Sequence, residues 1–251
     1  MNLNVPDTRQ SLLADRLEAG QHIVAIEAAR EFGVSVDTIR RDILAMEAAG
    51  KAHRVRGGAI PVATPALPLH ERLEGAAAIS VDMVEAALHE IGQASTILVD
   101  GGTTTLRIME HLQILPDRLV MTPSPWIAIA CQARGIEVFL LGGRLRPQGG
   151  IATGDSALEQ IGKVAVDVAL LGACGLDAKF GLSSDDHDEA HMKRAMQRAA
   201  KRAIVVTLGD KIGRKARHHT FAVHQIDTVV TDAPSHQTAR LVAAGTRVVT
   251  P

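Results

Sequence analysis

The sequence is poor in aromatic residues: among its 251 residues there is no Tyr, one Trp and four Phe. Proteins that bind single-stranded nucleic acid stack the bases on aromatic rings, so the composition argues against that class. Modules that recognise RNA through stacked bases are disfavoured for the same reason.

Long apolar runs are also missing, although 46% of the residues are hydrophobic. No stretch reaches the roughly 18 apolar residues that a membrane-spanning helix requires. The first ten residues, MNLNVPDTRQ, lack the charged and apolar regions of a signal peptide. The two cysteines, Cys131 and Cys174, lie in apolar surroundings, which favours buried free thiols over a disulfide. We therefore expect a cytoplasmic protein without a membrane segment.

The stretch from Phe32 to Ala59 predicts a helix-turn-helix. Gly33 can end the helix Ala25–Phe32, and Ser35 is placed to cap the next helix. That next helix has one apolar stripe at helical spacing, formed by Val36, Ile39, Ile43 and Met46. Two helices joined by a tight turn are the unit that places its second helix in the major groove of DNA.

Basic residues gather on the other face of this helix and in the segment that follows, which reads as a β-hairpin wing. A short strand at 22–24 is expected to pair with the wing. Between Thr38 and Gly58 there are five Lys or Arg residues and two acidic residues, a local charge of +3, whereas the whole chain carries −1. A local excess of this kind suits contact with phosphates; the alternative is a solvated helix face. The predicted DNA-binding residues are Ser35, Thr38, Arg40, Arg41, Lys51, Arg54 and Arg56.

The chain is expected to form two domains. Residues 1–60, which begin with a helix from Thr8 to Ala19, form the DNA-binding domain. Residues 61–79 form a linker, because three prolines within eight residues favour an extended segment. Residues 80–251 alternate between helices and strands, which is typical of a mostly parallel α/β sheet covered on both faces. The expected strands are 96–99, 119–122, 137–141, 167–171, 203–207, 228–231 and 247–249, and the expected helices are 81–91, 126–133, 189–201 and 237–244.

A ligand site is expected beyond the carboxyl ends of these strands. Asp100-Gly-Gly-Thr-Thr-Thr105 follows a strand and opens a helix. Its glycines admit a ligand close to the backbone, and its threonines offer hydroxyl and N–H groups at a helix start, which favours phosphate. Asp100 would accept from a sugar hydroxyl or fix the loop. The alternative is an ordinary capped turn.

Other loops in the same kind of position carry weaker signals. Thr122-Pro-Ser124 and Gly142-Gly143 each follow a strand. Lys193 lies one helical turn after Glu189, so a simple ion pair between them is an alternative to a ligand contact. Lys211 also follows a strand, with an exposed surface lysine as the alternative.

Motifs for a metal or a dinucleotide are not supported. His187 and His191 are four residues apart, but the H-E-x-x-H order is absent, and the sequence identifies no third or fourth ligand. No G-x-G-x-x-G follows a strand. We expect neither a metal nor a cofactor.

Several segments resemble the DeoR-type family of bacterial regulators of sugar metabolism. The helix-turn-helix string Val34–Ile43 and Arg56-Gly-Gly-Ala59 resemble the DNA-binding domain of that family. Further matches follow in order along nearly the whole chain: Val99–Thr104, Gly142–Arg146, Gly154, Gly172, Gly175, Glu189–Met196 and Lys211–Gly213.

The resemblance implies a transcriptional regulator, usually a repressor of a carbohydrate-utilisation operon, that binds double-stranded operator DNA as a homo-dimer or homo-tetramer. It also implies a C-terminal domain similar in fold to sugar-phosphate isomerases and CoA transferases, which senses a phosphorylated sugar. Carried over by position, the effector-binding residues are Asp100, Gly101, Gly102, Thr103, Thr104, Ser124, Gly142, Gly143, Glu189, Lys193 and Lys211.

Two positions depart from the family pattern. Pro123 stands where the family usually has Asn, so an amide contact is lost, and Leu208 stands where the family tends to have an acid.

The alternative function is a sugar-phosphate isomerase or transferase, in which a carboxylate serves as general base. The acids available for that role are Asp100, Asp185, Asp186 and Glu189. We favour the regulator, with no catalytic residue, because an enzyme has no need for residues 32–59.

Overall fold

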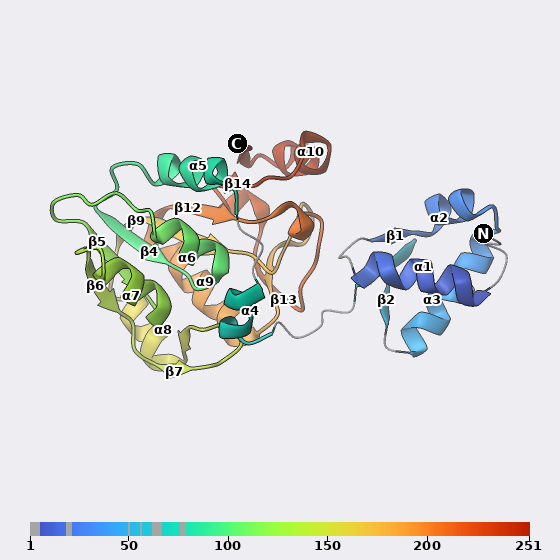
Figure 1. Ribbon diagram of the computed structural model, residues 1–251, viewed down its shortest axis with the longest axis horizontal. Helices are drawn as coiled ribbons and strands as arrows, with labels where there is room; N and C mark the ends of the chain where they lie inside the picture. The colour runs from blue at the N-terminus through green and yellow to red at the C-terminus, as the bar shows by residue number, and fades with distance from the viewer. Residues whose placement is uncertain (1–5, 19–21, 50, 56, 62–66, 76–78) are drawn as a thin grey trace. The chain divides into compact units, whose positions relative to one another are not determined.

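Two compact units, Met1–Thr64 and Pro65–Pro251, make up the chain (Figure 1). The computed structural model describes residues 6–18, 22–49, 51–55, 57–61, 67–75 and 79–251. Each unit has a hydrophobic core of its own.

The first unit is a winged helix-turn-helix. Its elements are α1 (Pro6–Glu18), β1 (Ile23–Val24), α2 (Ala25–Phe32), α3 (Val36–Ala48), β2 (Ala52–Val55) and β3 (Gly58–Pro61). Strand β3 pairs antiparallel with both β2 and β1. The predicted pairing of a short strand at 22–24 with the wing is therefore confirmed.

The predicted apolar stripe of α3 packs into this core. Ile39, Ile43 and Met46 are buried, and Val36 packs against them while partly exposed. On α2, the small residues at Ala25, Ala28 and Ala29 and the ring of Phe32 are buried, as the spacing predicts.

Asp42 departs from the predicted charge pattern. We counted it with the charges near the DNA-binding face, but it is only 3% exposed. Its Oδ1 accepts hydrogen bonds from Arg9 Nη2 and Gln10 Nε2, both at 3.1 Å. A carboxylate on the inner side of α3 can be buried here because α1 supplies these donors, so Asp42 fastens α1 to α3 and adds nothing to the outer surface.

The second unit is a parallel α/β domain. Its first half comprises α4 (Leu69–Gly75), α5 (Val81–Ile91), β4 (Thr96–Val99), α6 (Thr103–Met109), β5 (Leu119–Thr122), α7 (Pro125–Gln132), β6 (Glu137–Leu140), β7 (Arg144–Leu145), β8 (Ala152–Thr153) and α8 (Asp155–Ile161). Its second half comprises β9 (Val166–Gly172), β10 (Gly175–Asp177), β11 (Gly181–Ser184), α9 (His187–Ala199), β12 (Ala200–Val206), η1 (Gly209–Lys211), β13 (His218–Phe221), η2 (Val223–Gln225), β14 (Thr228–Val230), α10 (Ser235–Ala243) and β15 (Arg247–Val249).

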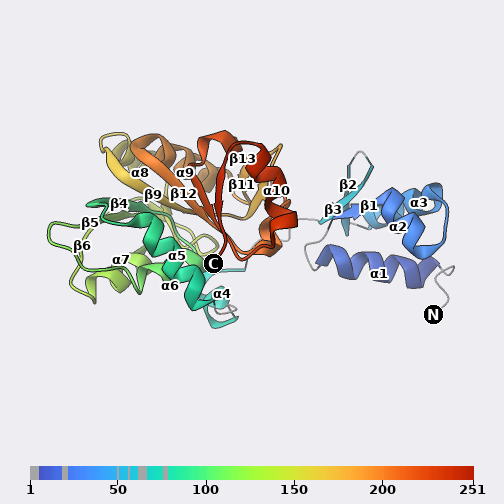
Figure 2. The same ribbon diagram turned by 90° about the horizontal axis from the view of Figure 1, so that it is seen from above.

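Seven strands form one parallel sheet in the order β15-β14-β12-β9-β4-β5-β6. Helices α5, α6 and α7 cover one face of the sheet, and α8, α9 and α10 cover the other (Figure 2). Along β4, Ile97 and Val99 belong to the hydrophobic core on the side of α5, α6 and α7, and Leu98 belongs to the core on the side of α8, α9 and α10. Successive side chains therefore point to opposite faces of the sheet. The predicted α/β fold class is confirmed, and each predicted strand is present.

The predicted linker is in part structured. Helix α4 forms within 61–79, after the last of the three prolines, where the sequence LHERLEG contains no further proline and reaches a glycine only at its last residue. Leu69 is 1% exposed, and Leu73 packs against the core beneath α5 and α6. The rest of that interval at 62–66 and 76–78 lies outside the described residues.

A smaller antiparallel sheet, β10-β11-β13, and the hairpin β7-β8 were not predicted. Strands such as Gly181–Ser184 and His218–Phe221 lack the β-branched apolar residues that signal a strand. Among the helices described, none has both the length and the apolar character needed to span a membrane.

Candidate DNA-binding surface and effector cavity

The start of α3 is fixed by two of the predicted DNA-binding residues. Ser35 Oγ accepts a hydrogen bond from the Thr38 backbone N–H at 3.1 Å and lies 2.8 Å from Thr38 Oγ1. Ser35 thus acts as the N-cap, which satisfies a free backbone donor of the first turn. Both side chains orient the helix that carries the arginines.

Arg40 and Arg41 are exposed on α3. Arg40 Nη1 donates to Asp37 Oδ1 at 2.8 Å, in a pair whose side chains are 65% and 72% exposed. Arg41 has no ion pair with any residue that the structure describes. Its guanidinium is therefore available to a duplex, whereas that of Arg40 is shared with Asp37.

The wing adds further cations. Lys51 is exposed at its start. Arg54 lies 3.5 Å from Glu47 of α3, and its backbone N–H donates to the same carboxylate at 3.1 Å. Glu47 therefore ties the wing to α3. Arg56 falls outside the described residues.

A cavity of about 320 Å³ lies where the order of strands reverses. From β4 the chain runs outward to β5 and β6, and β9 then returns on the other side of β4 toward β12 and β14. The loops that follow β4 and β9 diverge at this point, which opens a crevice in parallel α/β sheets. The structure brings eight of the predicted effector residues into its lining: Asp100, Gly101, Gly102, Thr103, Thr104, Glu189, Lys193 and Lys211.

Lys193 and Asp100 form a buried ion pair at the base of the cavity. Lys193 Nζ donates to Asp100 Oδ2 and, at 3.0 Å, to the carbonyl of Gly172. The Gly172 N–H donates to the same carboxylate oxygen at 3.1 Å. The alternative pairing of Lys193 with Glu189 is not found, because the buried carboxylate of Asp100 takes the ammonium group.

Asp100 stabilises the charged form of Lys193. Burial by itself lowers the pKa of Lys193, but the negative charge of Asp100 and the hydrogen bond to it, together with Glu189, outweigh burial and hold that pKa above its ordinary value. Asp100 is thus neutralised by a side chain rather than exposed to the cavity as a free negative charge.

Glu189 is the second notable carboxylate. Burial, with smaller contributions from Asp100 and Asp186, raises the pKa of Glu189 to about 7, although Lys193 and Arg72 oppose the shift. The carboxyl group of Glu189 is therefore protonated in part of the molecules and ionised in the rest near neutral pH. Asp185 Oδ1 is buried as well, and nothing in the described part of the chain donates a hydrogen bond to it. A buried acceptor without a donor fits a ligand that supplies hydroxyl or amine hydrogens.

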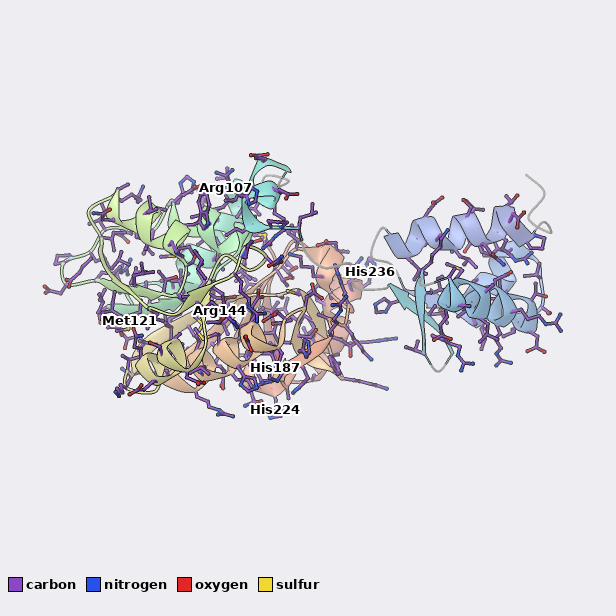
Figure 3. All side chains as sticks on the ribbon, turned by 90° about the horizontal axis from the view of Figure 1, so that it is seen from below. Arg107, Met121, Arg144, His187, His224 and His236 are labelled. Carbon is purple, nitrogen blue, oxygen red and sulfur yellow. The ribbon has the colours of Figure 1, made fainter. Side chains whose placement is uncertain are left out.

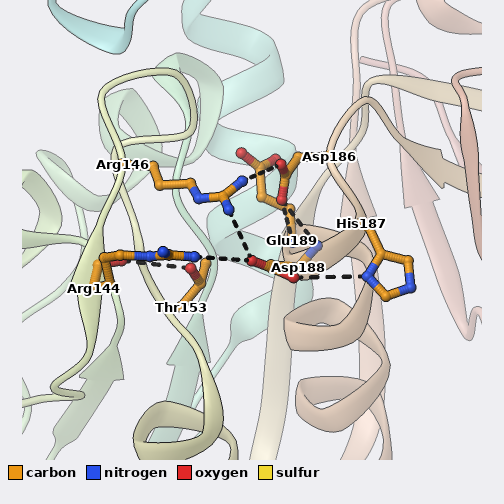
Figure 4. Close-up of polar contacts among 7 residues, drawn as sticks. All are labelled: Arg144, Arg146, Thr153, Asp186, His187, Asp188 and Glu189. Atoms are coloured by element: carbon orange, nitrogen blue, oxygen red, sulfur yellow. Dashed lines mark hydrogen bonds and ion pairs between the residues drawn. The ribbon is translucent and has the colours of Figure 1, made fainter.

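The rim of the cavity carries an ion-pair network around the start of α9 (Figure 4). Arg146 Nη1 lies 2.6 Å from Asp186, and its Nη2 lies 3.2 Å from Asp188. Arg144 reaches Asp188 at 3.7 Å. Arg144 and His187 appear on the same face of this unit (Figure 3).

Sequence reasoning missed part of the lining. The additional residues include Arg72, Thr105, Arg146, Gln148, Gly149, Ile151, Gly172, Ala173, Cys174, Val206 and Arg217, with Asp185 and Asp186. The motif Gly-Gly-Arg-Leu-Arg146 held a usable signal, since it placed a second arginine near a strand end. Arg72 had none, because its segment was assigned to the linker.

Three predicted effector residues do not line the cavity: Ser124, Gly142 and Gly143. They follow β5 and β6, which lie beyond β4 and away from the crevice. Ser124 is fully buried. At Gly143 (φ +157°) a Cβ would meet the Thr153 carbonyl oxygen at 2.7 Å, so this glycine serves the β7-β8 pairing.

The two departures from the family pattern and the histidine pair have structural explanations. Pro123 offers its carbonyl to the Ala152 N–H at 2.7 Å. Leu208 packs against the core beneath α5 and α6. The rings of His187 and His191 stand 4.4 Å apart, and the ring of His218 lies 5.5 Å from that of His187. Among the described residues, however, no group of three or more such side chains is arranged to hold a metal ion.

Both cysteines are free, as predicted. Cys131 is buried in the core, and burial raises its pKa to about 11. Cys174 lines the cavity, where burial is also the main cause of its raised pKa.

Both units match known protein families. The DeoR-like helix-turn-helix domain family matches residues 9–64, and the DeoR C terminal sensor domain family matches residues 81–233. A putative aga operon transcriptional repressor of Escherichia coli O157:H7 is 29% identical over 96% of this chain and 92% of its own length. The glycerol-3-phosphate regulon repressor of Escherichia coli K12 is 28% identical over 83% of each chain.

Among solved structures, a D-ribose-5-phosphate isomerase in complex with phospho-erythronic acid is similar over 53% of this chain and 55% of its own. The sequence identity is 16% and the TM-score is 0.36. The family matches identify a DNA-binding transcription factor rather than an enzyme. The chain belongs to the DeoR family of transcriptional regulators, with a helix-turn-helix domain followed by a sensor domain.

Proposed function

We propose that the protein is a cytoplasmic repressor of a carbohydrate-utilisation operon, controlled by a phosphorylated sugar that binds in the cavity of the sensor domain. The observation that carries the DNA-binding half is Arg41 on the capped helix α3, which is exposed and forms no ion pair with the residues that the structure describes. The names of the two related repressors support the repressing role and a link to carbohydrate or phosphorylated metabolites.

On the DNA side, α3 would enter the major groove. Arg41 would read a base edge, and Thr38 and Arg40 would contact bases or phosphates nearby. Lys51, Arg54 and, from its place in the sequence, Arg56 would contact phosphates from the wing. The domain of residues 1–60 would bind one half-site, so a dimer or tetramer would read a complete operator.

On the effector side, the cavity has the chemistry of a phosphorylated sugar site. Arg72, Lys211 and Arg217 bring positive charge to its lining. Thr103 and Thr104 add hydroxyl groups beside the glycines of the loop. Asp185 and Glu189 are acceptors for sugar hydroxyls. A volume of about 320 Å³ falls at the small end of ligand pockets.

Coupling requires that the effector bind two arrangements of the protein with different affinity. Occupancy of the sensor domain would then change how the DNA-binding domains of an oligomer are held.

The test has two steps. Sequence-specific DNA is first selected from a randomised duplex library with the full-length protein, and its affinity is measured by fluorescence anisotropy. A thermal-shift screen of sugar phosphates follows, because a ligand of the native state raises the melting temperature. A compound that stabilises the protein and changes operator affinity supports the proposal. Selection of no preferred sequence would refute the DNA-binding role.

A further inference from the structure

Helix α4 is the first element of the sensor unit after the wing, and it is fastened to the loop that follows β7. The Leu69 N–H donates to the Pro147 carbonyl at 2.9 Å. Arg72 Nη2 donates to the Gln148 carbonyl at 2.7 Å. Only seven residues separate Leu69 from the last wing residue, Pro61. Helix α4 is therefore close in sequence to the DNA-binding unit.

The same loop forms a wall of the cavity and lies between the cavity and α4. A Cβ at Gly149 would stand 1.9 Å from Glu189 Oε1, so the loop backbone rests on that carboxylate. A Cβ at Gly150 would stand 2.1 Å from Leu69 Cδ2, so the next residue rests on α4. The chain of contacts runs from Glu189 through the loop to Leu69. Contacts packed this closely transmit small displacements, because there is no free space between the atoms to absorb them.

Arg72 also reaches the cavity directly. It lines the cavity together with Thr103, Thr104 and Lys211, and these four side chains also border a neighbouring cavity beneath α4. Its positive charge opposes the rise in the pKa of Glu189.

The guanidinium of Arg72 retains donors for a ligand. Its Nε donates to the Leu67 carbonyl at 2.9 Å, and one Nη2 hydrogen is taken by Gln148. A guanidinium has five N–H groups, so those on Nη1 are not used by either of these bonds. Both acceptors are neutral carbonyls, and the described residues offer Arg72 no carboxylate within ion-pair distance. An oxyanion that binds here gains a charge-assisted, bidentate partner.

We infer that Arg72 binds the anionic group of the effector and that α4 carries this contact to the linker. This inference rests on the proposed function, because it assigns a phosphate-binding residue to the same cavity. Binding of the anion redistributes the hydrogen bonds that hold Arg72 to the loop, and the position of α4 changes with them. The sensor domain thus binds its ligand with a residue of its first helix after the linker.

The experiment compares full-length parent protein with three variants. Arg72→Gln keeps a donor for the Gln148 carbonyl and removes the charge, and Arg72→Lys keeps the charge. Arg240→Gln removes an exposed arginine from α10, outside the cavity lining, and serves as the matched control. The probes are ribose 5-phosphate, glucosamine 6-phosphate and inorganic phosphate, each titrated by calorimetry. Hydrogen exchange of residues 67–75 and anisotropy on the selected operator are measured with and without each probe.

We expect a probe that binds the parent to bind Arg72→Gln at least about tenfold more weakly, with Arg72→Lys in between and Arg240→Gln unchanged. The probe should alter hydrogen exchange of 67–75 and operator affinity in the parent but not in Arg72→Gln. Operator affinity without a probe should be the same in all four proteins.

Equal probe affinity in the parent and Arg72→Gln would overturn the inference and leave the proposed effector class standing. Weaker binding by Arg72→Gln, with exchange of 67–75 in the parent unaffected by the probe, would refute transmission through α4. Failure of every probe to bind the parent would overturn the proposed effector class, and the inference with it.

Discussion

Asp100, at the end of β4, holds the ammonium group of Lys193 from α9, and both side chains are almost fully buried. The pair joins the loop after one central strand to a helix on the face of the sheet. Gly172, at the end of β9, bonds to both partners. The floor of the cavity is therefore held by charge, and removal of either partner leaves the other without compensation.

Lys193→Met should destabilise the sensor domain by about 3–5 kcal/mol, because it leaves a buried carboxylate unpaired. Urea unfolding followed by circular dichroism measures the loss. The double variant Asp100→Asn, Lys193→Met should recover much of the stability, since the asparagine oxygen can still accept from the Gly172 N–H. A double variant no more stable than the single one would show that the pair itself is not the source of the effect.

The raised pKa of Glu189 predicts that the stability of the protein depends on pH. Its pKa is raised from 4.5 to about 7 in the folded protein, so the folded state binds the proton more tightly than the unfolded state. The free energy of unfolding should therefore fall as the pH rises from about 4.5 to about 7, by roughly 3 kcal/mol, and level off above. Glu189→Gln cannot titrate. Its stability should match the parent near pH 5 and exceed it near pH 8, and equal stability at both pH values would contradict the assignment.

Arg41→Ala should lower operator affinity by about 1–3 kcal/mol if Arg41 reads a base. The loss should be greatest on the selected operator and smaller on unrelated duplexes, which anisotropy titration can separate. Arg240→Ala, an exposed change in the sensor unit, is the control for a general loss of positive charge. An unchanged operator affinity for Arg41→Ala would exclude its role in recognition.

Ser124→Ala should leave effector binding unchanged, although position in the family pattern had assigned this serine to the pocket. Its hydroxyl is buried and has no hydrogen-bond partner among the residues described. Removal of an unsatisfied polar group is neutral or slightly stabilising. Thermal unfolding and probe titration of the variant check both expectations. A large fall in the affinity for the probe would show that Ser124 does contribute to the effector site.

The sequence predicted those parts of the structure in which local pattern and burial agree. The spacing of Ile39, Ile43 and Met46 predicted the buried face of α3, and short apolar runs predicted the strands of the large sheet. The local pattern did not predict the partner of a side chain where that partner lies far away along the sequence. Lys193 pairs with Asp100, 93 positions away along the chain, rather than with Glu189 one turn away.

The same limit applies to the residues that were missed. Asp42 reads as a surface acid until α1 brings Arg9 against it. Arg72 precedes Asp100 by 28 positions and reaches the cavity only because α4 packs onto the loop at 147–150. No period or motif within its own segment contains that information.

The contact between Asp37 and Arg40 gives the recognition helix a counterion of its own. A DNA phosphate that bound Arg40 would compete with the carboxylate of Asp37 for the positive charge of the guanidinium. Fewer condensed cations are displaced in total than the number of arginines and lysines suggests, so affinity should depend less steeply on salt concentration. Random genomic DNA offers phosphates but few base contacts, so it offsets less of the free energy lost when Arg40 leaves Asp37. The protein should therefore spend less time on non-specific sites.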